Sequence, residues 1–250
     1  MSEREETGPA WDAQRLTDPH VVADKRRRVR AMFSAIASSY DLNNRLHSFG
    51  RDQAWRRRAV AMAETRPGDR VADIACGTGD LAVLFAEAGC AVVGIDFTYA
   101  MLPLAAAKAS GPVWVNGDAQ ALPLADASVD VLSIAFGLRN VADPSAAMAE
   151  FRRVLRPGGR LIVLEFTTPP NPLIRGASRL HTDVIMPRTA SLIARDRSGA
   201  YRYLPRSVAT FLDRDGVETL MRETGFADVE SVSITFGVVA CYRGVNSGFA

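Results

Sequence analysis

Short apolar runs alternate with segments of helical periodicity over the middle of this chain. The apolar runs are Val71–Ala75, Ala91–Ile95, Val113–Asn116, Val129–Ala135 and Arg160–Phe166. Helical patterns lie between them, near Asp80–Ala88, Ala100–Ala109 and Pro144–Val154. Strands that alternate with helices at this spacing predict an α/β domain, in which a parallel sheet carries helices on both faces.

The last two apolar runs depart from this alternation. Val229–Thr235 and Val238–Arg243 are separated by Phe236 and Gly237 alone, which leaves no room for a crossover helix. Two strands joined so closely form an antiparallel hairpin. The sequence therefore predicts a doubly wound, mostly parallel seven-stranded sheet that ends in an antiparallel hairpin strand.

Composition and loop length divide the chain into regions. With 48% apolar and 23% charged residues it has an ordinary globular composition, and its three cysteines are too few and too scattered for a disulfide framework or a zinc site. We expect residues 1–24 to be a disordered lead, residues 25–65 a helical arm or cap, and residues 66–250 the α/β domain. Connections longer than about 15 residues are uncommon unless they are functional. The apolar helical pattern within residues 170–206 therefore predicts a helical lid inserted in that domain.

A glycine-containing turn, Cys76-Gly77-Thr78-Gly79-Asp80, follows the first predicted strand. Its spacing satisfies the loose dinucleotide pattern, in which a pyrophosphate binds at the start of a helix. Asp73 lies close to this turn, where a carboxylate would repel a pyrophosphate and attract an ammonium group. A turn of purely structural use is the remaining alternative.

Two further acids stand at the ends of predicted strands, where ligands bind in doubly wound sheets. Asp96 ends the second strand, 19 residues after Gly77, where an acid can bind a ribose diol. Asp118 follows the third strand, where a polar residue can reach an adenine edge. A ligand with adenine, ribose and a cationic amino-acid end, but no phosphate, fits this set. These acids therefore favour S-adenosylmethionine over a dinucleotide.

The fourth predicted strand ends in the sequence SIAFGLRNVADP. Arg139 and Asn140 follow the strand end, next to the position where a transferable methyl group would lie. A surface loop without function is the alternative. The position of the pair at the binding edge of the sheet favours the functional interpretation.

Several longer motifs resemble the ubiquinone/menaquinone biosynthesis C-methyltransferase family, over the region from about Lys25 to Gly244. The motifs are Tyr40-Asp41…Asn44…Ser48-Phe49-Gly50…Trp55, FGLRNV (136–141), RVLRPGGRLIVLEF (153–166), YRYLPRS (201–207) and ITFGVVACYRG (234–244). The resemblance implies the class I S-adenosylmethionine-dependent methyltransferase fold, with residues 66–250 as the methyltransferase domain. It also implies C-methylation of the ring of a polyprenylated quinol.

The resemblance favours demethylmenaquinol, the precursor of menaquinol, as the acceptor. Methylation of the benzoquinol intermediate in ubiquinone biosynthesis is the alternative. A methyltransferase that acts on RNA or on another small molecule also stays open, as does a cofactor-binding protein without enzymatic activity.

S-adenosylmethionine is the expected methyl donor. No metal is expected, because a phenolate attacking a sulfonium is electrostatically favourable and the sequence has no cluster of Cys and His ligands. The resemblance carries over Thr78, Asp96, Asp118 and Ala119 as cofactor contacts. The full expected cofactor-binding set is Asp73, Gly77, Thr78, Gly79, Asp96, Phe97, Met101, Asp118, Ala119 and Ala135. The chain departs from the usual family residues at Asn43, His47, Asp52, Ala135 and Thr167.

A quinol ring carbon becomes nucleophilic when its neighbouring hydroxyl loses a proton. Arg139 and Asn140 are the first candidates for stabilising the resulting oxyanion and for ordering a water that accepts the proton. Further catalytic candidates are Tyr40, Glu165, Tyr201 and Tyr203.

The isoprenoid tail of such a substrate resides in the bilayer, and no stretch of the chain approaches the roughly 18 apolar residues that a membrane span requires. The segment Lys25–Arg58 holds ten Lys or Arg residues against two Asp, which predicts attraction to an anionic leaflet of about 1 kcal/mol per basic residue. A solvated charged face and a nucleic-acid-binding segment are the alternatives.

The sequence FGLRN lacks the polar strand-end motif that is usual for methylation of bases at nitrogen, so no nucleic acid is expected as a partner. We expect instead a cytoplasmic protein in peripheral contact with the inner face of the membrane, with a polyprenylated quinol as its substrate. A homodimer is a further expectation.

Overall fold

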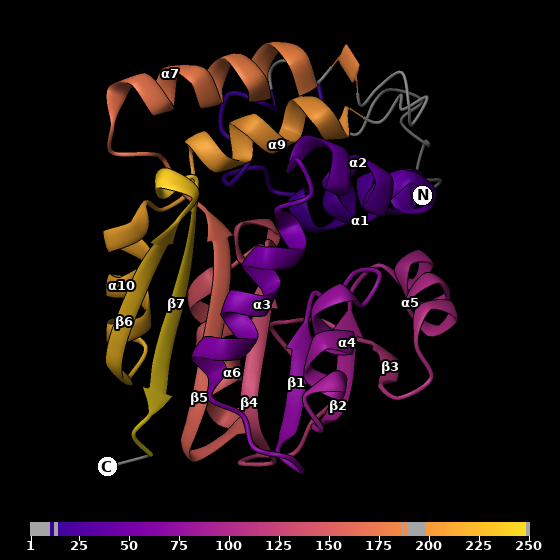
Figure 1. Ribbon diagram of the computed structural model, residues 1–250, viewed down its shortest axis with the longest axis vertical. Helices are drawn as coiled ribbons and strands as arrows, with labels where there is room; N and C mark the ends of the chain where they lie inside the picture. Colours follow the sequence, from indigo (N-terminus) through magenta and orange to yellow (C-terminus); the bar gives the residue numbers. More distant parts are fainter. Residues whose placement is uncertain (1–10, 13–14, 187, 190–198, 249–250) are drawn as a thin grey trace.

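The computed structural model describes residues 11–12, 15–186, 188–189 and 199–248. Its strands are β1 (Arg70–Ile74), β2 (Ala91–Asp96), β3 (Val113–Asn116), β4 (Val129–Ala135), β5 (Leu155–Phe166), β6 (Phe226–Ile234) and β7 (Val239–Asn246). Over the described residues they form a seven-stranded sheet in the order β3-β2-β1-β4-β5-β7-β6, which lies at the centre of the molecule (Figure 1).

The first five strands pair in parallel. β1 lies between β2 and β4, with β3 beside β2 and β5 beside β4. β7 runs antiparallel to both β5 and β6. The short turn Thr235–Gly237 joins β6 to β7, so these two strands must run in opposite directions. The predicted α/β fold with a C-terminal antiparallel hairpin is confirmed. The parallel strands all end at the same edge, here called the carboxyl edge, where ligands bind in doubly wound sheets.

Helices cover both faces of the sheet. They are α3 (Asp52–Ala63), α4 (Asp80–Glu87), α5 (Leu102–Lys108), α6 (Pro144–Val154) and α10 (Arg214–Glu223). α3 and α4 pack on one face through an apolar cluster that includes Trp55 and Phe85. α6 and α10 pack on the other face through a cluster that includes Phe151 and Met221. Two apolar layers therefore hold the strand ends in fixed positions.

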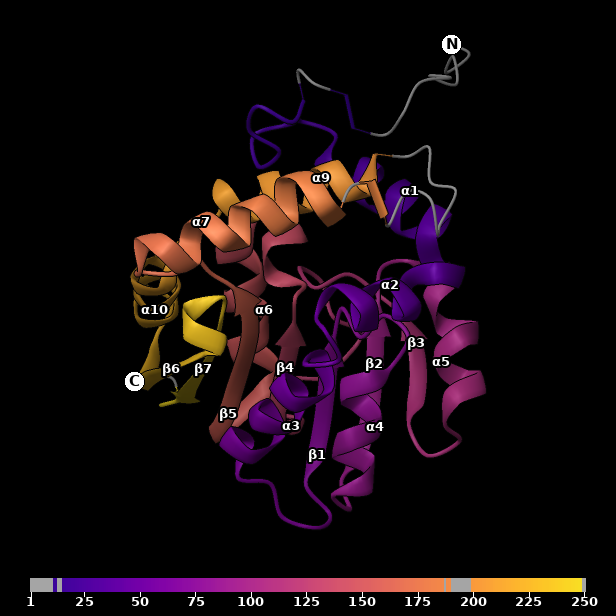
Figure 2. The same cartoon turned by 45° about the horizontal axis from the view of Figure 1, so that its top comes forward.

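A further layer, here called the cap, lies across the carboxyl edge (Figures 1 and 2). It comprises α1 (Lys25–Ile36), α2 (Tyr40–His47), α7 (Pro172–Leu180), the π-helical turn His181–Ile185 and α9 (Ala200–Ala209). In both views α7 lies over the side of β5 and β7, whereas α2 lies over β1 and β2. Among the described residues, no helix is both long and apolar enough to cross a membrane.

The cap contains part of the region that the sequence predicts as a lid. Within residues 170–206, α7, the π-helical turn and α9 are helical, and residues 187 and 190–198 lie outside the described part of the chain. Met186 and Tyr203 pack against Val29 and Met32 of α1 in a third apolar cluster. Segments from opposite ends of the chain thus share one small core above the sheet.

The expected helical arm over residues 25–65 differs from the structure at α3. This helix packs on the sheet and does not join the cap, because Trp55, Ala59 and Ala63 form an apolar stripe along one side of it. The cap on this side therefore ends before α3.

The expected disordered lead over residues 1–24 also differs in its described part. Trp11 and Leu16 are buried in the third apolar cluster, and the Trp11 ring lies 4.4 Å from the Tyr203 ring between centroids. Burial of a large aromatic side chain can offset the entropy lost when the chain is ordered. The lead is therefore attached to the cap at this point.

We expect Gly94→Ala to destabilise the sheet. A Cβ at Gly94 would lie 2.5 Å from two ring atoms of Trp114, and overpacking of this kind costs about 1–3 kcal/mol. The midpoint of thermal unfolding should fall by several degrees. Gly111→Ala is the matched control, since its Cβ would meet nothing closer than 3.8 Å and should change stability by less than about 0.5 kcal/mol. Equal midpoints for the two variants would contradict the packing argument.

Candidate active site

Two cavities lie between the carboxyl edge and the cap. The strand-end cavity has an empty volume of about 770 Å³ and is bordered by the ends of β1, β2 and β4 and by α1. The lid cavity is larger, about 1620 Å³, and is bordered by α1, α2, α7 and α9. Phe33, Tyr40 and Phe136 border both cavities. The two spaces therefore meet at an aromatic boundary.

Asp96 binds two backbone segments that border the strand-end cavity. Its Oδ2 accepts a hydrogen bond from the backbone N–H of Gly77 at 2.8 Å, and its Oδ1 accepts one from the backbone N–H of Thr98 at 2.7 Å. Burial raises the pKa of Asp96, and these two backbone donors partly oppose that shift. Each carboxylate oxygen has a further lone pair, so Asp96 can also accept hydrogen bonds from ligand hydroxyls.

The two glycines of the loop after β1 have different roles. Gly77 has a φ of +55°, and a Cβ there would meet only Cε1 of Tyr40, at 3.8 Å. It borders the strand-end cavity, so its missing side chain lets a ligand approach the backbone. At Gly79 a Cβ would lie 2.4 Å from the Trp114 ring. Gly79 therefore serves packing inside the fold.

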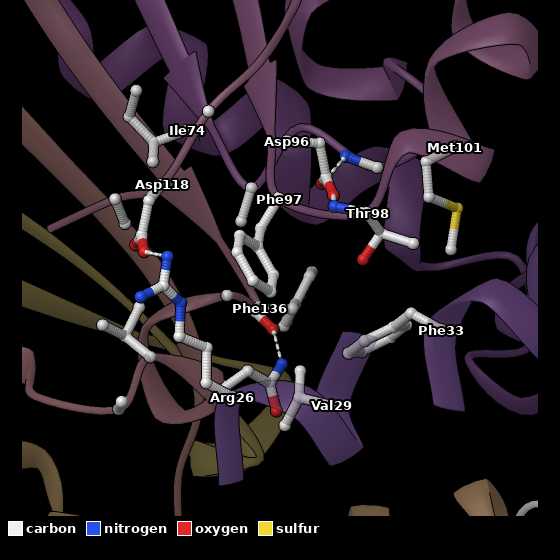
Figure 3. A pocket seen from close by; sticks show the side chains of 18 of the residues that line it. Arg26, Val29, Phe33, Ile74, Asp96, Phe97, Thr98, Met101, Asp118 and Phe136 are labelled. Carbon is white, nitrogen blue, oxygen red and sulfur yellow. Dashed lines mark hydrogen bonds and ion pairs between the residues drawn. The ribbon is translucent and has the colours of Figure 1, made fainter. Parts of the chain in front are cut away.

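Asp118 connects the strand-end cavity to the cap. Its Oδ2 lies 2.5 Å from Nη2 of Arg26 in α1, and the guanidinium of Arg26 also lies 4.9 Å from the centroid of the Phe97 ring. Figure 3 shows Arg26, Phe97 and Asp118 gathered at one side of the cavity. The first turn of α1 therefore closes this side of the site.

Most of the expected cofactor-binding residues border the strand-end cavity. They are Gly77, Asp96, Phe97, Met101, Asp118, Ala119 and Ala135. Asp73, Thr78 and Gly79 are not among the lining residues. Any contact that these three make with a cofactor stays a prediction.

Asp73 and Thr78 are engaged in other contacts. Asp73 accepts a hydrogen bond from Ser133 at 2.7 Å, and burial raises its pKa to about 7. Thr78 donates its hydroxyl hydrogen to Asp41 of α2 at 2.5 Å. Lys108 lies 2.8 Å from the same Asp41 carboxylate, so Thr78 belongs to a polar network that attaches α2 to the loop and to α5.

Arg139 lies in the turn after β4 and forms a buried ion pair. Its Nη1 lies 2.5 Å from Oε1 of Glu165 and donates at 2.8 Å to the backbone oxygen of Phe136. Only 5% of the Arg139 side chain and 1% of the Glu165 side chain are exposed. Arg139 borders the lid cavity, and Glu165 holds it there. Nε of Arg139 has no hydrogen-bond partner among the described residues.

Asn140 borders the strand-end cavity, on the other side of the aromatic boundary. Its Nδ2 donates to the backbone oxygen of Phe136 at 3.1 Å, and its Oδ1 accepts from the Tyr203 hydroxyl of α9 at 2.9 Å. Burial raises the pKa of Tyr203, which keeps the hydroxyl protonated as a donor. The structure thus brings Arg139 and Asn140 to adjacent cavities and orients both through the Phe136 carbonyl.

The other catalytic candidates divide into two groups. Tyr40 borders both cavities and Tyr201 borders the lid cavity. Glu165 and Tyr203 border neither cavity and instead contact Arg139 and Asn140. Their geometry suits holding the site residues in place.

Sequence reasoning missed two basic residues and the aromatic boundary. Lys25 and Arg26 appear in the sequence as part of a charged run, yet Lys25 is buried and Arg26 pairs with Asp118. The helical phase of α1 could have found Lys25, because the buried positions 25, 28, 29, 32 and 36 follow one side of the helix. No local pattern indicates that Phe33 and Phe136 border the same two cavities.

Among the described residues there is no group of three or more His, Cys, Asp or Glu side chains that could hold a metal ion.

Comparison with known proteins agrees with this architecture. Residues 21–246 match the ubiE/COQ5 methyltransferase family. A demethylmenaquinone methyltransferase of Thermus thermophilus is 45% identical over 219 residues, which cover 85% of this chain and 99% of that protein. A ubiquinone/menaquinone biosynthesis C-methyltransferase of Geobacter sulfurreducens is 39% identical over 232 residues, covering 89% of this chain and 90% of that protein.

Among solved structures, an S-adenosylmethionine-dependent methyltransferase of Thermotoga maritima matches with a TM-score of 0.65. The match covers 87% of this chain and 99% of that one, at 21% identity, and so bears on the fold alone. The extent of the sequence matches is decisive for the family. The chain belongs to the ubiE/COQ5 methyltransferase family.

Proposed function

We propose that this protein transfers the methyl group of S-adenosylmethionine to a ring carbon of a polyprenylated quinol, with demethylmenaquinol as the favoured acceptor. The observation that carries the proposal is the meeting of two cavities at Phe33, Tyr40 and Phe136. Methyl transfer requires donor and acceptor to face each other in a fixed orientation, and two cavities that share one boundary can provide it. The names of the relatives support demethylmenaquinol and, as the alternative, the benzoquinol intermediate of ubiquinone biosynthesis.

The residues of the strand-end cavity fit S-adenosylmethionine. Asp96 can accept hydrogen bonds from the ribose hydroxyls, and the open Gly77 backbone leaves room for the amino-acid end. Phe97 and Met101 offer apolar surface for the adenine ring, with Asp118 at its edge. When bound, the cofactor supplies an electrophilic methyl group on a sulfonium sulfur.

The lid cavity fits a ring that carries an isoprenoid tail. Its walls include the apolar side chains of Met32, Ile36, Phe166 and Met186. Its empty volume of about 1620 Å³ is roughly twice the 770 Å³ of the strand-end cavity. The lid cavity is therefore the roomier of the two, and it is the one proposed to hold the ring and the first part of a tail.

Arg139 is the group that stabilises the acceptor oxyanion in this proposal. Loss of the ring hydroxyl proton spreads negative charge onto the neighbouring ring carbon and makes it the nucleophile. The bond between that carbon and the methyl group would form as the sulfur–methyl bond breaks, and the ring carbon would then give up its own proton to restore the aromatic ring. Because Nη1 is held by Glu165 and Phe136, the other N–H groups of the guanidinium fork remain for the phenolate oxygen. Tyr40 and Asn140 border the boundary and order the water that takes the proton, while the aromatic side chains exclude bulk water.

An assay with reduced acceptors tests the proposed function. We expect the purified protein to transfer labelled methyl from S-adenosylmethionine to demethylmenaquinol, with a higher kcat/KM than for the corresponding benzoquinol. Mass spectrometry of the product should place one new methyl group on a ring carbon. Faster turnover of the benzoquinol would move the assignment to the alternative acceptor. Labelling of RNA without labelling of either quinol would overturn the proposal.

We expect loss of Arg139 to slow turnover far more than it weakens cofactor binding, because the oxyanion develops only along the reaction. Removal of one such donor typically lowers kcat by about 10²–10³-fold. Arg139→Lys should recover little, since an ammonium lacks the planar fork. Turnover and calorimetric binding of S-adenosylmethionine would be measured for both Arg139→Lys and Arg139→Met.

A double variant controls for stability. Arg139→Met leaves Glu165 buried and unpaired, which typically costs about 3–5 kcal/mol. Arg139→Met/Glu165→Gln removes the charge from both positions and should regain much of the thermal stability. If kcat also returned to the wild-type value, Arg139 would have only a structural role.

Most basic side chains of the run from Lys25 to Arg30 are buried or paired with a carboxylate. Lys25 and Arg28 are buried. Arg26 pairs with Asp118, and Arg27 pairs with Asp24 at 2.7 Å. Arg30 is exposed in this run, and Arg45, Arg51, Arg57 and Arg58 are exposed further along the Lys25–Arg58 segment, so part of its charge remains available to an anionic leaflet.

We propose that membrane contact is centred on a group of exposed apolar side chains, here called the apolar rim: Leu42, Leu46, Phe49, Leu180, Val184 and Ile185. The rim comes from two segments that touch, since the Phe49 ring lies 5.3 Å from that of His181 between centroids. His181 also borders the lid cavity, so the rim surrounds a point where a tail can leave for the bilayer. Exposed Arg45, Arg51 and Arg179 flank it and suit anionic headgroups.

Vesicle binding tests the apolar rim. Leu180→Asp/Ile185→Asp should reduce binding to anionic vesicles at least tenfold, because two charged side chains would enter the interface. Leu104→Asp on α5 is the matched control, since Leu104 is 38% exposed and is not part of the apolar rim. Co-sedimentation would be measured at low and high salt. Similar binding by the control and the rim variant would contradict this surface.

A further inference from the structure

The ammonium group of Lys25 contacts the backbone of the turn that carries Arg139 and Asn140. Its Nζ donates to the backbone oxygen of Arg139 at 2.9 Å and to that of Val141 at 2.5 Å. Lys25 is 2% exposed and is the first residue of α1. One buried side chain of the cap therefore binds two carbonyl groups on either side of Asn140.

The third N–H of the Lys25 ammonium group is linked to α9 through His20. Its Nζ lies 3.2 Å from Nδ1 of His20. An ammonium has no lone pair, so Nδ1 must be the acceptor and the ring hydrogen must lie on Nε2. Nε2 lies 2.9 Å from the backbone oxygen of Ser207 in α9 and donates to it. Lys25 and His20 thus connect α1, the lead and α9 to the turn after β4.

We propose that Lys25 is a positioning residue for methyl transfer, whose protonated side chain holds the Arg139–Val141 turn in its active geometry. The proposal rests on the proposed function. Without the ammonium, the carbonyl groups of Arg139 and Val141 lose their buried donor, and the turn is free to shift. Tyr203 would still hold Asn140 from α9, so we expect displacement of the Arg139 guanidinium more than collapse of the fold.

Several titratable groups face Lys25. The Arg139 guanidinium lies on the turn itself, while His20 and Asp18 belong to the lead. Burial is the main reason that the pKa of Lys25 falls to about 8, with the positive charge of Arg139 lowering it further and Asp18 opposing the shift. The pKa of His20 is also lowered, chiefly by burial, which keeps its Nδ1 free to accept.

The lowered pKa of Lys25 gives a direction for the effect of pH. Below about pH 8 the side chain keeps its proton, and both carbonyl groups stay bound. Above that pH the neutral amine has two N–H groups for three acceptors, and its lone pair faces an oxygen. The held geometry should therefore be lost as pH rises through about 8.

Lys25→Met tests the proposal at pH 7. We expect kcat to fall tenfold to a hundredfold, as small displacements of catalytic groups commonly produce. The dissociation constant of S-adenosylmethionine should change less than about threefold. Arg27→Met is the matched control, two residues along the same helix, because Arg27 is 68% exposed and pairs with Asp24.

The pH profile separates positioning from general structure. The ratio of wild-type to Lys25→Met kcat should fall toward one between pH 7 and 9.5, because only the wild type titrates at this position. Ionisation of the quinol affects both proteins equally and cancels in the ratio. If Lys25→Met does not fold, Lys25→Gln serves in the same comparison, since its uncharged amide can still donate to a carbonyl group.

The outcomes distinguish the proposed function from the role of Lys25. A wild type that methylates no quinol at any pH would overturn the proposed function itself. An active wild type with a kcat ratio that does not change with pH, or a loss equal to that of Arg27→Met, would overturn the role of Lys25 alone. A large loss of cofactor affinity in Lys25→Met would assign the residue to binding.

Discussion

The buried ion pair between Arg139 and Glu165 is the interaction on which the site depends. Each charge would be costly to bury alone, so the turn after β4 and the end of β5 must lie close enough to pair at 2.5 Å. β4 and β5 are neighbouring parallel strands, and the sheet places both ends at the same edge. Because β4 and β5 are neighbours in the sheet, the Arg139 guanidinium is held beside Glu165 at the border of the lid cavity.

Phe136 is the second constraint, because its backbone and side chain serve different parts of the site. Its φ of +57° is uncommon for a residue with a side chain and persists only where the surroundings enforce it. Its carbonyl accepts from both Arg139 and Asn140, and its ring borders both cavities. The strained backbone of Phe136 therefore lies where the strand-end cavity, proposed for the cofactor, meets the lid cavity, proposed for the acceptor.

The sequence predicts the sheet, its closing hairpin and the residues at the strand ends well, because these follow from local periodicity and from the common direction of parallel strands. Asp96 and Asp118 border the strand-end cavity as expected from their positions. The cap is predicted less well. Trp11 and Lys25 are buried although their surroundings in the sequence are polar or charged, since the partners that bury them, Tyr203 and Arg139, lie more than a hundred residues away.

The sequence by itself determined the fold class, because strand and helix patterns alternate along the chain. It also determined the acids and glycines at the carboxyl edge and the Arg139–Asn140 pair after β4, because each of these lies at a strand end or in the loop that follows it. Only the tertiary structure decided that Gly77 borders a cavity while Gly79 packs against Trp114. It also decided that Arg139 and Asn140 border different cavities and that Lys25 binds their turn. The physical reason is that burial and hydrogen bonding in the cap are set by contacts between distant segments, which no local pattern contains.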